Sequence, residues 1–448
     1  MDDAPIIHDF LCYNNGVEQN YSVPLEKSLD GSQLELLHLL AHQAGMLHKP
    51  LYIAGGVVRD LLLGRPLNDF DLVVEGDAAV LAEAILKKFG GRVIFHARFG
   101  TATWILDEIT FKRLNVPVFH SSNSPTSLDL ISARSETYSQ PGALPTVQKS
   151  TIDDDLRRRD FTINAMAIRL DGDHFGELFD PLGGQKDIEN KLIRVLHPIS
   201  FVDDPTRMFR AVRYAARYGF EIESETLSLI NDEARAILSG LSGERLRHEF
   251  DLVFEEPNPS AILKQLADLD LLKPIHSVLA NADRQLPTIE EPRPEFGEFA
   301  IPDILTFRQS LGWVLFLMNS PEADIEAFAE RLAFPASLTK AIFAASTSNK
   351  KLSSFKDWKP SQLTFYLDEL PSLAVYTVYL VSKEQSLRDY LAKWQHVKPH
   401  ITGDDLKKRG LEPGPRYGEI LRQLRAAWLD GDVSSKDEEM LLLERLAK

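Results

Sequence analysis

The sequence contains a single cysteine, Cys12, among 448 residues, and it contains no long apolar run. One cysteine cannot close an internal disulfide, and no cysteine cluster is present to hold a structural zinc ion. The best apolar segment, residues 313–318, is predicted to be part of a core helix and is far shorter than the roughly 20 residues that cross a bilayer. The first ten residues lack a basic start followed by an apolar stretch, so no secretory signal is expected. These absences predict a cytoplasmic protein without membrane contact.

Positive charge is also scarce, because the formal net charge is −16 at pH 7. Indiscriminate binding along nucleic acids depends on many Lys and Arg contacts to phosphate, so this charge argues against a general coating protein. Any RNA contact must use local basic patches. The apolar and charged fractions, 44% and 26%, are typical of a chain that folds. Nothing in the sequence indicates a protein partner.

The length and the periodicity of the chain predict several domains, since 448 residues exceed one ordinary core. After an N-terminal extension of residues 1–23, residues 24–168 predict a small mixed sheet with helices. Helical spacing then predicts a neck over 169–280, a body over 281–400 and a tail over 401–448, with a Pro/Glu-rich linker at 285–302. The expected strands are 51–54, 69–74, 92–95 and 102–106, and the expected neck helices are 205–218, 224–238 and 243–254.

The segment 51–64 combines a short apolar strand, a Gly-Gly turn and the start of a helix. Gly55 and Gly56 lack Cβ atoms, so phosphate oxygens can approach the backbone N–H groups, and the helix N-terminus adds favourable partial charge. Arg59 lies within the first turns of this helix and within reach of a phosphate. The segment therefore predicts a phosphate-binding turn.

Two acids follow on the next expected strand. Period-two alternation places Asp69 and Asp71 on one face and apolar residues on the other. Like charges repel, so the pair is best stabilised by a divalent cation, and Mg²⁺ suits carboxylates with substrate phosphates. An isolated Asp-x-Asp is more often a solvated strand end, but the Gly-Gly unit upstream favours the metal site. Asp129, on a further expected strand, is a candidate third acid, with an exposed surface residue as the alternative.

The run 55–64, followed by Asp69-x-Asp71, resembles the signature of the class II tRNA nucleotidyltransferases and bacterial poly(A) polymerases. The resemblance implies an α/β nucleotidyltransferase head followed by an all-helical neck, body and tail. It implies that the two aspartates hold two Mg²⁺ ions, which activate the RNA 3′-hydroxyl and orient the nucleotide. It also assigns the triphosphate to the two glycines and Arg59.

A second signature, residues 155–167, is similar to the Arg-Arg-Asp-Phe-Thr-Ile-Asn-Ala motif of the same family. If the chain is helical from Asp160 onward, this carboxylate and the amide of Asn164 lie four apart on one face, where both can meet ribose hydroxyls. The resemblance adds Arg159 to the ribose site and Arg158 to the other nucleotide or RNA contacts. Taken without it, the arginines are typical of a solvated basic run, and the aspartate is typical of a helix N-cap.

A third signature runs from Asp203 to Arg207 and resembles the family's Glu-Asp-x-x-Arg motif, with Asp203 where glutamate is usual. Asp204 and Arg207 are three apart and are expected on one helix face, as an acceptor beside donors. Such a pair fits the Watson–Crick edges of cytosine and adenine but not those of uracil and guanine. Asp204 before Pro205 is also typical of a helix N-cap, and the two roles are compatible.

Further arginines share that predicted helix. Arg207, Arg210, Arg213 and Arg217 fall within about 120° of one another around it, which predicts a phosphate-facing ridge. A salt-bridged or solvated face is the alternative.

The segment 134–145 resembles the family's flexible loop, which is shortened in enzymes that add only CC, so its presence favours CCA or A addition.

The tail has a local excess of positive charge. Six basic residues stand against two glutamates between positions 407 and 425, and the segment resembles the tail of tRNA nucleotidyltransferases. A plain solvated helix pair is the alternative. The residues expected to contact tRNA are Lys407, Lys408, Arg409 and Arg416.

The signatures together predict a template-independent RNA nucleotidyltransferase that adds C, A or both from CTP and ATP to the tRNA 3′ end and releases pyrophosphate. A bacterial poly(A) polymerase is the alternative enzyme, because its catalytic motifs are nearly the same. An inactive RNA-binding relative is a third hypothesis, and the intact carboxylates argue against it.

Overall fold

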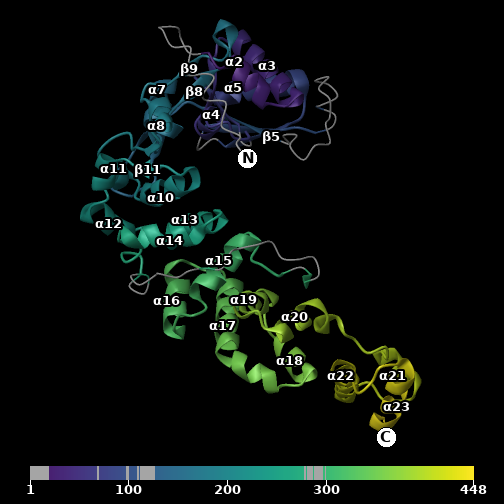
Figure 1. Cartoon of the computed structure of the whole chain (residues 1–448). Helices are drawn as coiled ribbons and strands as arrows, with labels where there is room; N and C mark the ends of the chain where they lie inside the picture. The colour runs from purple at the N-terminus through teal and green to yellow at the C-terminus, as the bar shows by residue number, and fades with distance from the viewer. Residues whose placement is uncertain are drawn as a thin grey trace, which may run out of the picture. The chain divides into compact units, whose positions relative to one another are not determined.

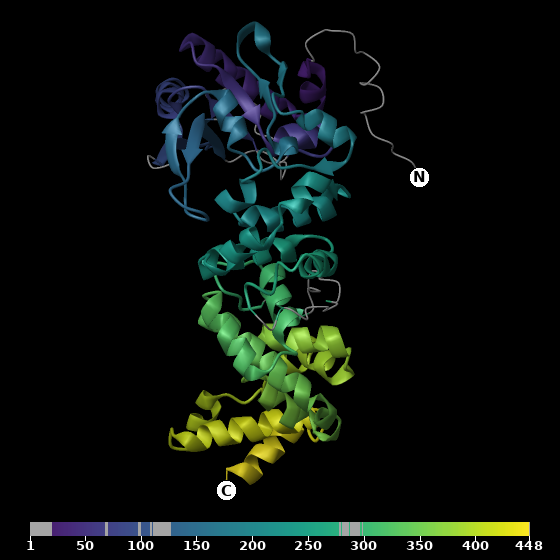
Figure 2. The same cartoon turned by 90° about the vertical axis from the view of Figure 1, so that its left-hand side faces the viewer.

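The structure is a computed structural model that describes residues 20–67, 70–96, 100–107, 110, 127–276, 279, 286, 296–297 and 299–447. By its internal contacts the chain divides into two compact units, residues 1–240 and 241–448. Figures 1 and 2 show the elements of each unit in two views. The domain boundaries expected at residues 168, 280 and 400 stay predictions.

A seven-stranded mixed sheet forms the centre of the first unit, in the order β3-β4-β5-β2-β1-β8-β9. Strands β2 and β5 run parallel, and the other described neighbours in the sheet run antiparallel. The strands are β1 Leu51–Ala54, β2 Asp71–Val74, β3 Arg92–His96, β4 Thr101–Ile105, β5 Ser127–Ser132, β8 Ala167–Arg169 and β9 Leu178–Phe179. A separate hairpin pairs β6 Arg134–Thr137 with β7 Thr146–Lys149, and a short parallel pair joins β10 Leu192–Ile193 to β11 Glu221–Ile222.

Helices cover the sheet and follow it in the first unit (Figure 1). Helix α5 packs on β3, β4 and β5, and α3 packs on α5. On the central strands the apolar side chains of Ile53, Leu72 and Leu130 are fully buried, and so is Val73, which alternates with Leu72 on β2, so both faces of this strand are covered. The helices are α2 Ser22–Ser28, α3 Gly31–Met46, α4 Gly56–Leu62, α5 Ala78–Phe89, α7 Ile152–Arg157, α8 Gly184–Glu189, α9 Ser200–Asp203, α10 Thr206–Tyr218, α11 Ser224–Ser228 and α12 Asp232–Ser239.

Two expected helices of this unit are wrong. The segment after Asp160 forms a short 3₁₀ turn, Thr162–Asn164, and then the strand β8, because Phe161 pairs with Val195 and Ala167–Arg169 pairs with β1. The single helix expected over 224–238 is instead the two helices α11 and α12. The side chain of Asn231 accepts a hydrogen bond from the backbone N–H of Ala234 and so starts the second helix.

The second unit is helical and is built around an aromatic cluster. Trp313 on α15 lies 5.3 Å and 5.0 Å, between ring centroids, from Phe250 and Phe254 on α13. A Cβ on Gly312 would lie 2.4 Å from the Phe254 ring, so a glycine is required for this close approach. The helices are α13 Gly243–Glu255, α14 Pro259–Asp268, α15 Phe307–Leu317, α16 Glu322–Arg331, α17 Ala336–Lys351, α18 Pro360–Leu367, α19 Ser372–Ser382, α20 Gln385–Ala392, α21 Gly403–Lys408, α22 Pro415–Asp430 and α23 Lys436–Leu446.

Among the residues that the structure describes, no helix is both long and apolar enough to span a lipid bilayer.

A buried acid in the aromatic cluster predicts a pH-dependent stability. Asp251 accepts a 2.6 Å hydrogen bond from the Trp313 indole and lies 3.8 Å from Arg247, yet burial raises the pKa of Asp251 to about 6. Its protonated form therefore stabilises the folded unit below the unfolded pKa, and this contribution is lost as the pH rises through about 6. We expect Asp251→Asn to increase the free energy of unfolding at pH 8 by up to about 3 kcal/mol and therefore to raise the melting temperature at that pH. Near pH 4 the substitution should change the melting temperature little.

Thermal melting from pH 4 to pH 8 measures this effect. The control is Asp268→Asn, which removes an exposed acid of α14 in the same unit and should leave the pH dependence as it is. Equal melting curves for Asp251→Asn and the wild type at pH 8 would contradict the prediction.

Candidate active site

The strands that carry the predicted metal-binding acids are neighbours in the sheet. Asp71 on β2 is the direct cross-strand partner of Asp129 on β5, so both residues belong to the same face of the sheet. Asp129 is exposed, and its Oδ1 accepts a 2.6 Å hydrogen bond from Thr103 Oγ1 on β4. Asp69 lies outside the described residues, and only the backbone of Asp71 is described. The register thus brings the candidate third acid beside the Asp-x-Asp strand.

The Gly-Gly turn lies directly against the second signature. Gly55 has φ 86° and ψ −131°, a conformation suited to glycine, and a Cβ there would lie 2.1 Å from Arg159 Nη1. A larger residue would therefore displace the guanidinium group. The turn expected to hold the triphosphate and an arginine expected at the ribose are consequently adjacent.

Arg59 joins the same two motifs. Its guanidinium is buried, donates to Asn164 Oδ1, and pairs with Asp60 Oδ2 at 2.9 Å. It also lies 4.7 Å from the ring centroid of Tyr218. Burial acts to lower the pKa of Arg59, but the hydrogen bonds to Asp60 and the nearby Tyr218 outweigh it, so the pKa is raised. Arg59 is thus a fixed cation beside the expected ribose site, and its contact with the triphosphate stays a prediction.

Asp160 and Asn164 meet, although not on the α-helix that was expected. Asn164 Nδ2 donates to Asp160 Oδ1 at 2.9 Å, and the backbone N–H of Phe161 donates to the same oxygen at 2.8 Å. Arg210 Nη2 lies 2.6 Å from the other carboxylate oxygen. Burial alone would raise the pKa of Asp160, but Arg210, the Asn164 hydrogen bond and Arg207 hold it below its usual range. Asp160 is therefore an ionised acceptor at the bottom of the site.

Asp155 is a buried carboxylate that holds two arginines. Its Oδ1 accepts from Arg158 Nη2 at 2.7 Å, and its Oδ2 accepts from Arg159 Nη2 at 3.0 Å. The backbone N–H of Arg134 donates to it as well, at 3.3 Å. The Asp155 side chain is 0% exposed, and its charge is compensated by the guanidinium groups of Arg158 and Arg159, with that of Arg134 nearby. This acid fixes the directions of the two arginines of the second signature.

The β6–β7 hairpin, which contains the loop expected to be flexible, joins this network. Glu136 on β6 accepts from Arg158 at 3.0 Å and from the Tyr138 hydroxyl at 3.1 Å. Burial, with Glu136 and Asp204 nearby, raises the pKa of Tyr138 to about 12 although Arg207 opposes this. At the loop tip the backbone N–H of Gly142 donates to Val202 on α9 at 3.2 Å. The hairpin therefore lies against the third signature.

The prediction that Asp204 lies on the same helix face as Arg207 is wrong, because Asp204 lies before α10 and not within it. Asp204 precedes α10 with φ −137° and ψ 95°, because its Oδ1 accepts from the backbone N–H of Thr206 at 3.2 Å and from its hydroxyl at 2.7 Å. This is the capping contact that was the alternative interpretation. Arg207, in the first turn of α10, is buried and donates to Ser200 Oγ at 2.7 Å and to the backbone oxygen of Arg158 at 3.0 Å. Base contact by this pair stays a prediction.

The four arginines of α10 do not form one exposed ridge. Arg207 and Arg213 are both 5% exposed, because the helix is covered on that side, whereas Arg217 is exposed. Arg213 lies 5.2 Å from the ring centroid of Tyr214, and Arg210 is paired with Asp160. The prediction that these arginines form an exposed, phosphate-facing ridge is therefore wrong. Contact of Arg210 or Arg213 individually with the nucleotide or RNA stays a prediction.

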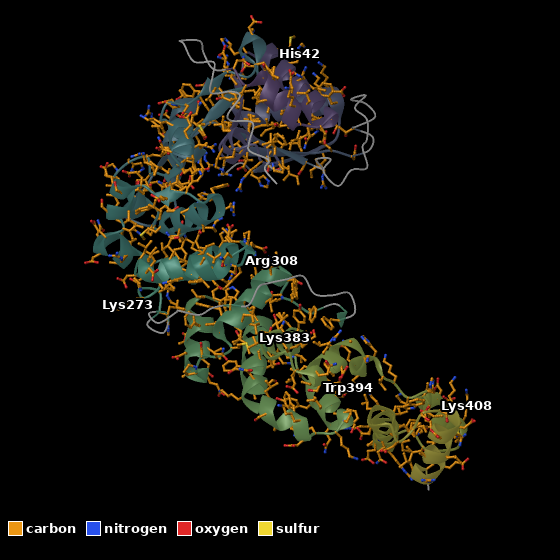
Figure 3. The ribbon with its side chains drawn as sticks, in the orientation of Figure 1. His42, Lys273, Arg308, Lys383, Trp394 and Lys408 are labelled. Carbon is orange, nitrogen blue, oxygen red and sulfur yellow. The ribbon has the colours of Figure 1, made fainter. Side chains whose placement is uncertain are left out.

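The basic residues expected in the tail lie on α21 and at the start of α22. The side chain of Lys408 is 77% exposed and 3.7 Å from Asp405, and Figure 3 labels it on the tail. Arg409 contacts Met440, and Arg416 donates to the backbone oxygen of Leu446 at 3.3 Å. Lys407 is exposed on the same short helix, α21.

Three residues of this network were not assigned from the sequence: Asp155, Glu136 and Tyr138. Asp155 had a readable signal, because it stands three and four positions before Arg158 and Arg159, the spacing at which side chains on a helix meet. The hairpin residues had no such signal. Their link to the arginines depends on a contact between segments 22 positions apart.

Comparison with known proteins decides the family. Residues 51–194 match the family described as the poly A polymerase head domain, and residues 219–283 match a probable RNA- and SrmB-binding site of polymerase A. An A-adding tRNA nucleotidyltransferase from Halalkalibacterium halodurans is 32% identical and aligns with 93% of this chain and 93% of its own length. The chain belongs to the tRNA nucleotidyltransferase family. Its expected family, fold class and enzyme class are thereby confirmed.

Two further relatives are a longer protein and an enzyme whose structure was solved in complex with tRNA. An A-adding tRNA nucleotidyltransferase from Geobacter sulfurreducens is 33% identical over 99% of this chain, which spans 51% of that relative. The structure of a Thermotoga maritima CCA-adding enzyme in complex with tRNA matches with a TM-score of 0.69 and 28% identity, covering 96% of this chain and 98% of its own. The family generally uses divalent metal ions.

The buried acid of this network gives a testable positioning role. Asp155→Asn removes the charge that holds Arg158 and Arg159. Arg158 keeps its pair with Glu136, but Arg159 loses its described carboxylate partner, and removing one partner of a buried pair costs about 3 to 5 kcal/mol. We expect a lower melting temperature and a raised KM for the nucleotide triphosphate, because the arginines beside Gly55 lose their directions. Thermal melting and steady-state kinetics measure both effects.

Asp153→Asn is the matched control, since Asp153 lies on the same helix and pairs with the exposed Arg157. It should change neither quantity appreciably. A loss of stability at Asp155 with an unchanged KM would leave this acid a purely structural role.

Proposed function

We propose that this nucleotidyltransferase adds the terminal adenosine, from ATP, to tRNA whose 3′ end stops at CC. The observation that carries the proposal is the hairpin 134–149, whose loop lies against α9 beside the base-reading signature. Both curated relatives described above are named A-adding enzymes. A loop of this kind is shortened in relatives that add only CC.

The chemistry we propose follows the two-metal scheme. The donors available fit Mg²⁺, because the strand register places Asp71 beside Asp129 and carboxylate oxygens are the ligands that this ion prefers. Asp69 is added to this set from the family resemblance. Two Mg²⁺ ions held there would supply charge stabilisation at the α-phosphate while the RNA 3′-hydroxyl attacks and pyrophosphate leaves. Thr103 keeps Asp129 in one orientation by donating a hydrogen bond to it. Little general-base chemistry is required of the protein, because metal ions held there would lower the pKa of the 3′-hydroxyl, whose proton then passes to water.

The triphosphate and ribose are assigned to the network around the Gly-Gly turn. Gly55 and Gly56 lack Cβ atoms, so the guanidinium groups of Arg159 and Arg59 lie directly against the turn and supply positive charge for the phosphate oxygens. Asp160 and Asn164 offer an acceptor and an amide to the ribose hydroxyls. Arg158 and Arg210 act mainly through the acids that they hold.

The base is assigned to Asp204 and Arg207. A carboxylate accepts from the N6 amine of adenine, and a guanidinium donates to its N1. The same pair also fits cytosine, so it excludes uracil and guanine without choosing between the other two. That choice is assigned to the hairpin, where Tyr138 lies close enough to Arg207 and Asp204 for their charges to act on its hydroxyl.

The remaining contacts are with the body of the tRNA. The basic residues of α21 and the start of α22 are proposed to contact tRNA phosphates. A cytoplasmic location, where tRNA is found, also stays a prediction.

A substrate panel tests the proposed activity. With ATP, we expect one adenosine to be added to tRNA ending in CC, and we expect little addition to tRNA that lacks the whole CCA end. CTP alone should give no product with either substrate. Sequencing-gel analysis of the 3′ ends resolves each added nucleotide.

Three other outcomes would replace the proposal. Completion of CCA on the shorter tRNA from CTP and ATP would identify a CCA-adding enzyme. Addition of CC without A would identify the CC-adding activity. Long adenosine runs on unrelated RNA would identify a poly(A) polymerase, and absence of any product with Mg²⁺ would identify an RNA-binding relative.

Base selection has a separate test in Asp204→Asn. Asparagine keeps an oxygen to cap α10 but also presents a donor to the adenine amine, which should cost about 1 to 3 kcal/mol of discrimination, or one to two orders of magnitude. We expect the ratio of ATP to UTP and GTP incorporation to fall while the melting temperature is kept. Single-nucleotide incorporation assays give the ratio. The control is Asp232→Asn on the exposed start of α12, and equal ratios in both variants would place base choice elsewhere.

A further inference from the structure

The six basic residues that the sequence groups into one tail patch divide into two groups in the structure. Helix α22 lies between α18 and α21, and it packs against both (Figure 1). Four of the residues lie on or next to α21 or at the start of α22. The other two, Arg422 and Arg425, lie further along α22 and face Phe365 on α18. The second group therefore belongs to a different surface.

A cavity of about 490 Å³ lies where α18, α22 and the segment 397–401 meet. This volume is within the range of roughly 300 to 1,000 Å³ that small-ligand pockets span. The lining residues used below are Phe365, Asp368, Lys398, Ile401, Arg422 and Arg425.

One wall of the cavity is fixed by internal hydrogen bonds. Arg425 pairs with Asp368 Oδ2 and donates through Nε to the backbone oxygen of Val397 at 2.8 Å. The other oxygen of Asp368 accepts from the Tyr390 hydroxyl at 3.1 Å. These two charged groups are therefore occupied and serve as a preformed frame.

Two cations at the cavity are not occupied in this way. The Arg422 guanidinium lies 4.5 Å from the ring centroid of Phe365, and within the described part of the chain it makes no hydrogen bond or ion pair. Lys398 is exposed and likewise makes no ion pair there. The lining carries three cations against two carboxylates, in a chain whose net charge is −16. The lining therefore carries one net positive charge, which attracts an anion.

We propose that this cavity holds one unpaired nucleotide of the bound tRNA. The base stacks on the face of the Arg422 guanidinium that is opposite Phe365, and the phosphate lies near Lys398. RNA recognition uses unpaired bases stacked on aromatic rings and on arginine planes, and the apolar Ile401 fits the remaining base or sugar surface. The inference rests on the proposed function, because it requires tRNA as the substrate.

A nucleotide explains the lining better than a phosphate alone. A bare phosphate would use the two cations but would leave the aromatic support and the apolar floor without a purpose. A nucleotide would use the cations, the Phe365 ring and the apolar Ile401 together. The ring of Phe365 keeps the Arg422 guanidinium in place for stacking on the base.

The discriminating variant is Arg422→Lys, which keeps the charge but removes the planar surface. We expect roughly tenfold weaker binding of tRNA ending in CC, by fluorescence anisotropy, and the loss should persist at high salt because stacking does not depend on counterion release. Phe365→Leu should weaken binding to a similar degree, and the double variant should lose little more than either alone. Lys340→Gln, an exposed lysine of α17, is the control and should bind like the wild type.

Chemical probing of the tRNA with and without the protein locates the nucleotide. We expect Arg422→Lys to lose protection at one nucleotide or two adjacent ones. Wild-type affinity of Arg422→Lys, or an even loss of protection along the tRNA, would overturn the stacking site and leave only surface charge.

The two proposals fail in different ways. If the enzyme does not act on tRNA, the wild type itself will show neither tight tRNA binding nor A addition. If only the cavity is misassigned, the wild type will bind and extend tRNA and the variants will match it. Thermal melting of each variant excludes unfolding as the cause of weak binding.

Discussion

The nucleotide site depends on buried carboxylates that allow many arginines to stand close together. A triphosphate demands concentrated positive charge, but guanidinium groups brought together repel one another and lose their hydration. Asp155 holds Arg158 and Arg159, Asp160 pairs with Arg210, and Asp60 pairs with Arg59. Each acid fixes the direction of a cation as well as neutralising it. Without them the Gly-Gly turn, the second signature and α10 would have no stable common arrangement.

The same acids connect parts of the site that bind different portions of the nucleotide. The Arg158 guanidinium donates hydrogen bonds to Glu136 of the hairpin and to Asp155. The backbone oxygen of Arg158 accepts a hydrogen bond from Arg207. The hairpin is therefore linked to Arg207, the arginine proposed to contact the base, through one intervening residue. Because Arg159 shares Asp155 and lies against the glycine turn, the regions proposed for the triphosphate and the base belong to one network of contacts. This arrangement is suited to a pocket whose base preference is set by a loop that does not itself belong to the motif.

Much of the fold and part of the site could be predicted from local sequence alone. Apolar runs broken by glycine located β1, β3 and β4, and helical spacing located α10 and α13. The helix expected after Asp160 failed because Phe161 and Ala167–Arg169 pair with strands distant in sequence, and tertiary pairing overrides local spacing. Asp160 and Asn164 still meet, because the compact 3₁₀ turn also brings side chains four positions apart together. The hairpin residues Glu136 and Tyr138 were missed because their partners are set by the fold.

Spacing along a helix says which residues are neighbours, but it does not say what covers them. The arginines of α10 were predicted to share one exposed side of the helix, yet Arg207 and Arg213 are buried. Arg207 donates to the backbone oxygen of Arg158, and the partly exposed Arg210 pairs with Asp160. In the tail, α22 packs between two helices and thus presents its early and late basic residues to different surroundings. Charge counted along the sequence therefore predicted that cations gather in the tail, while only packing shows that Arg422 rests on an aromatic ring and Lys408 is open to solvent. The first arrangement suits a stacked base, and the second suits a phosphate.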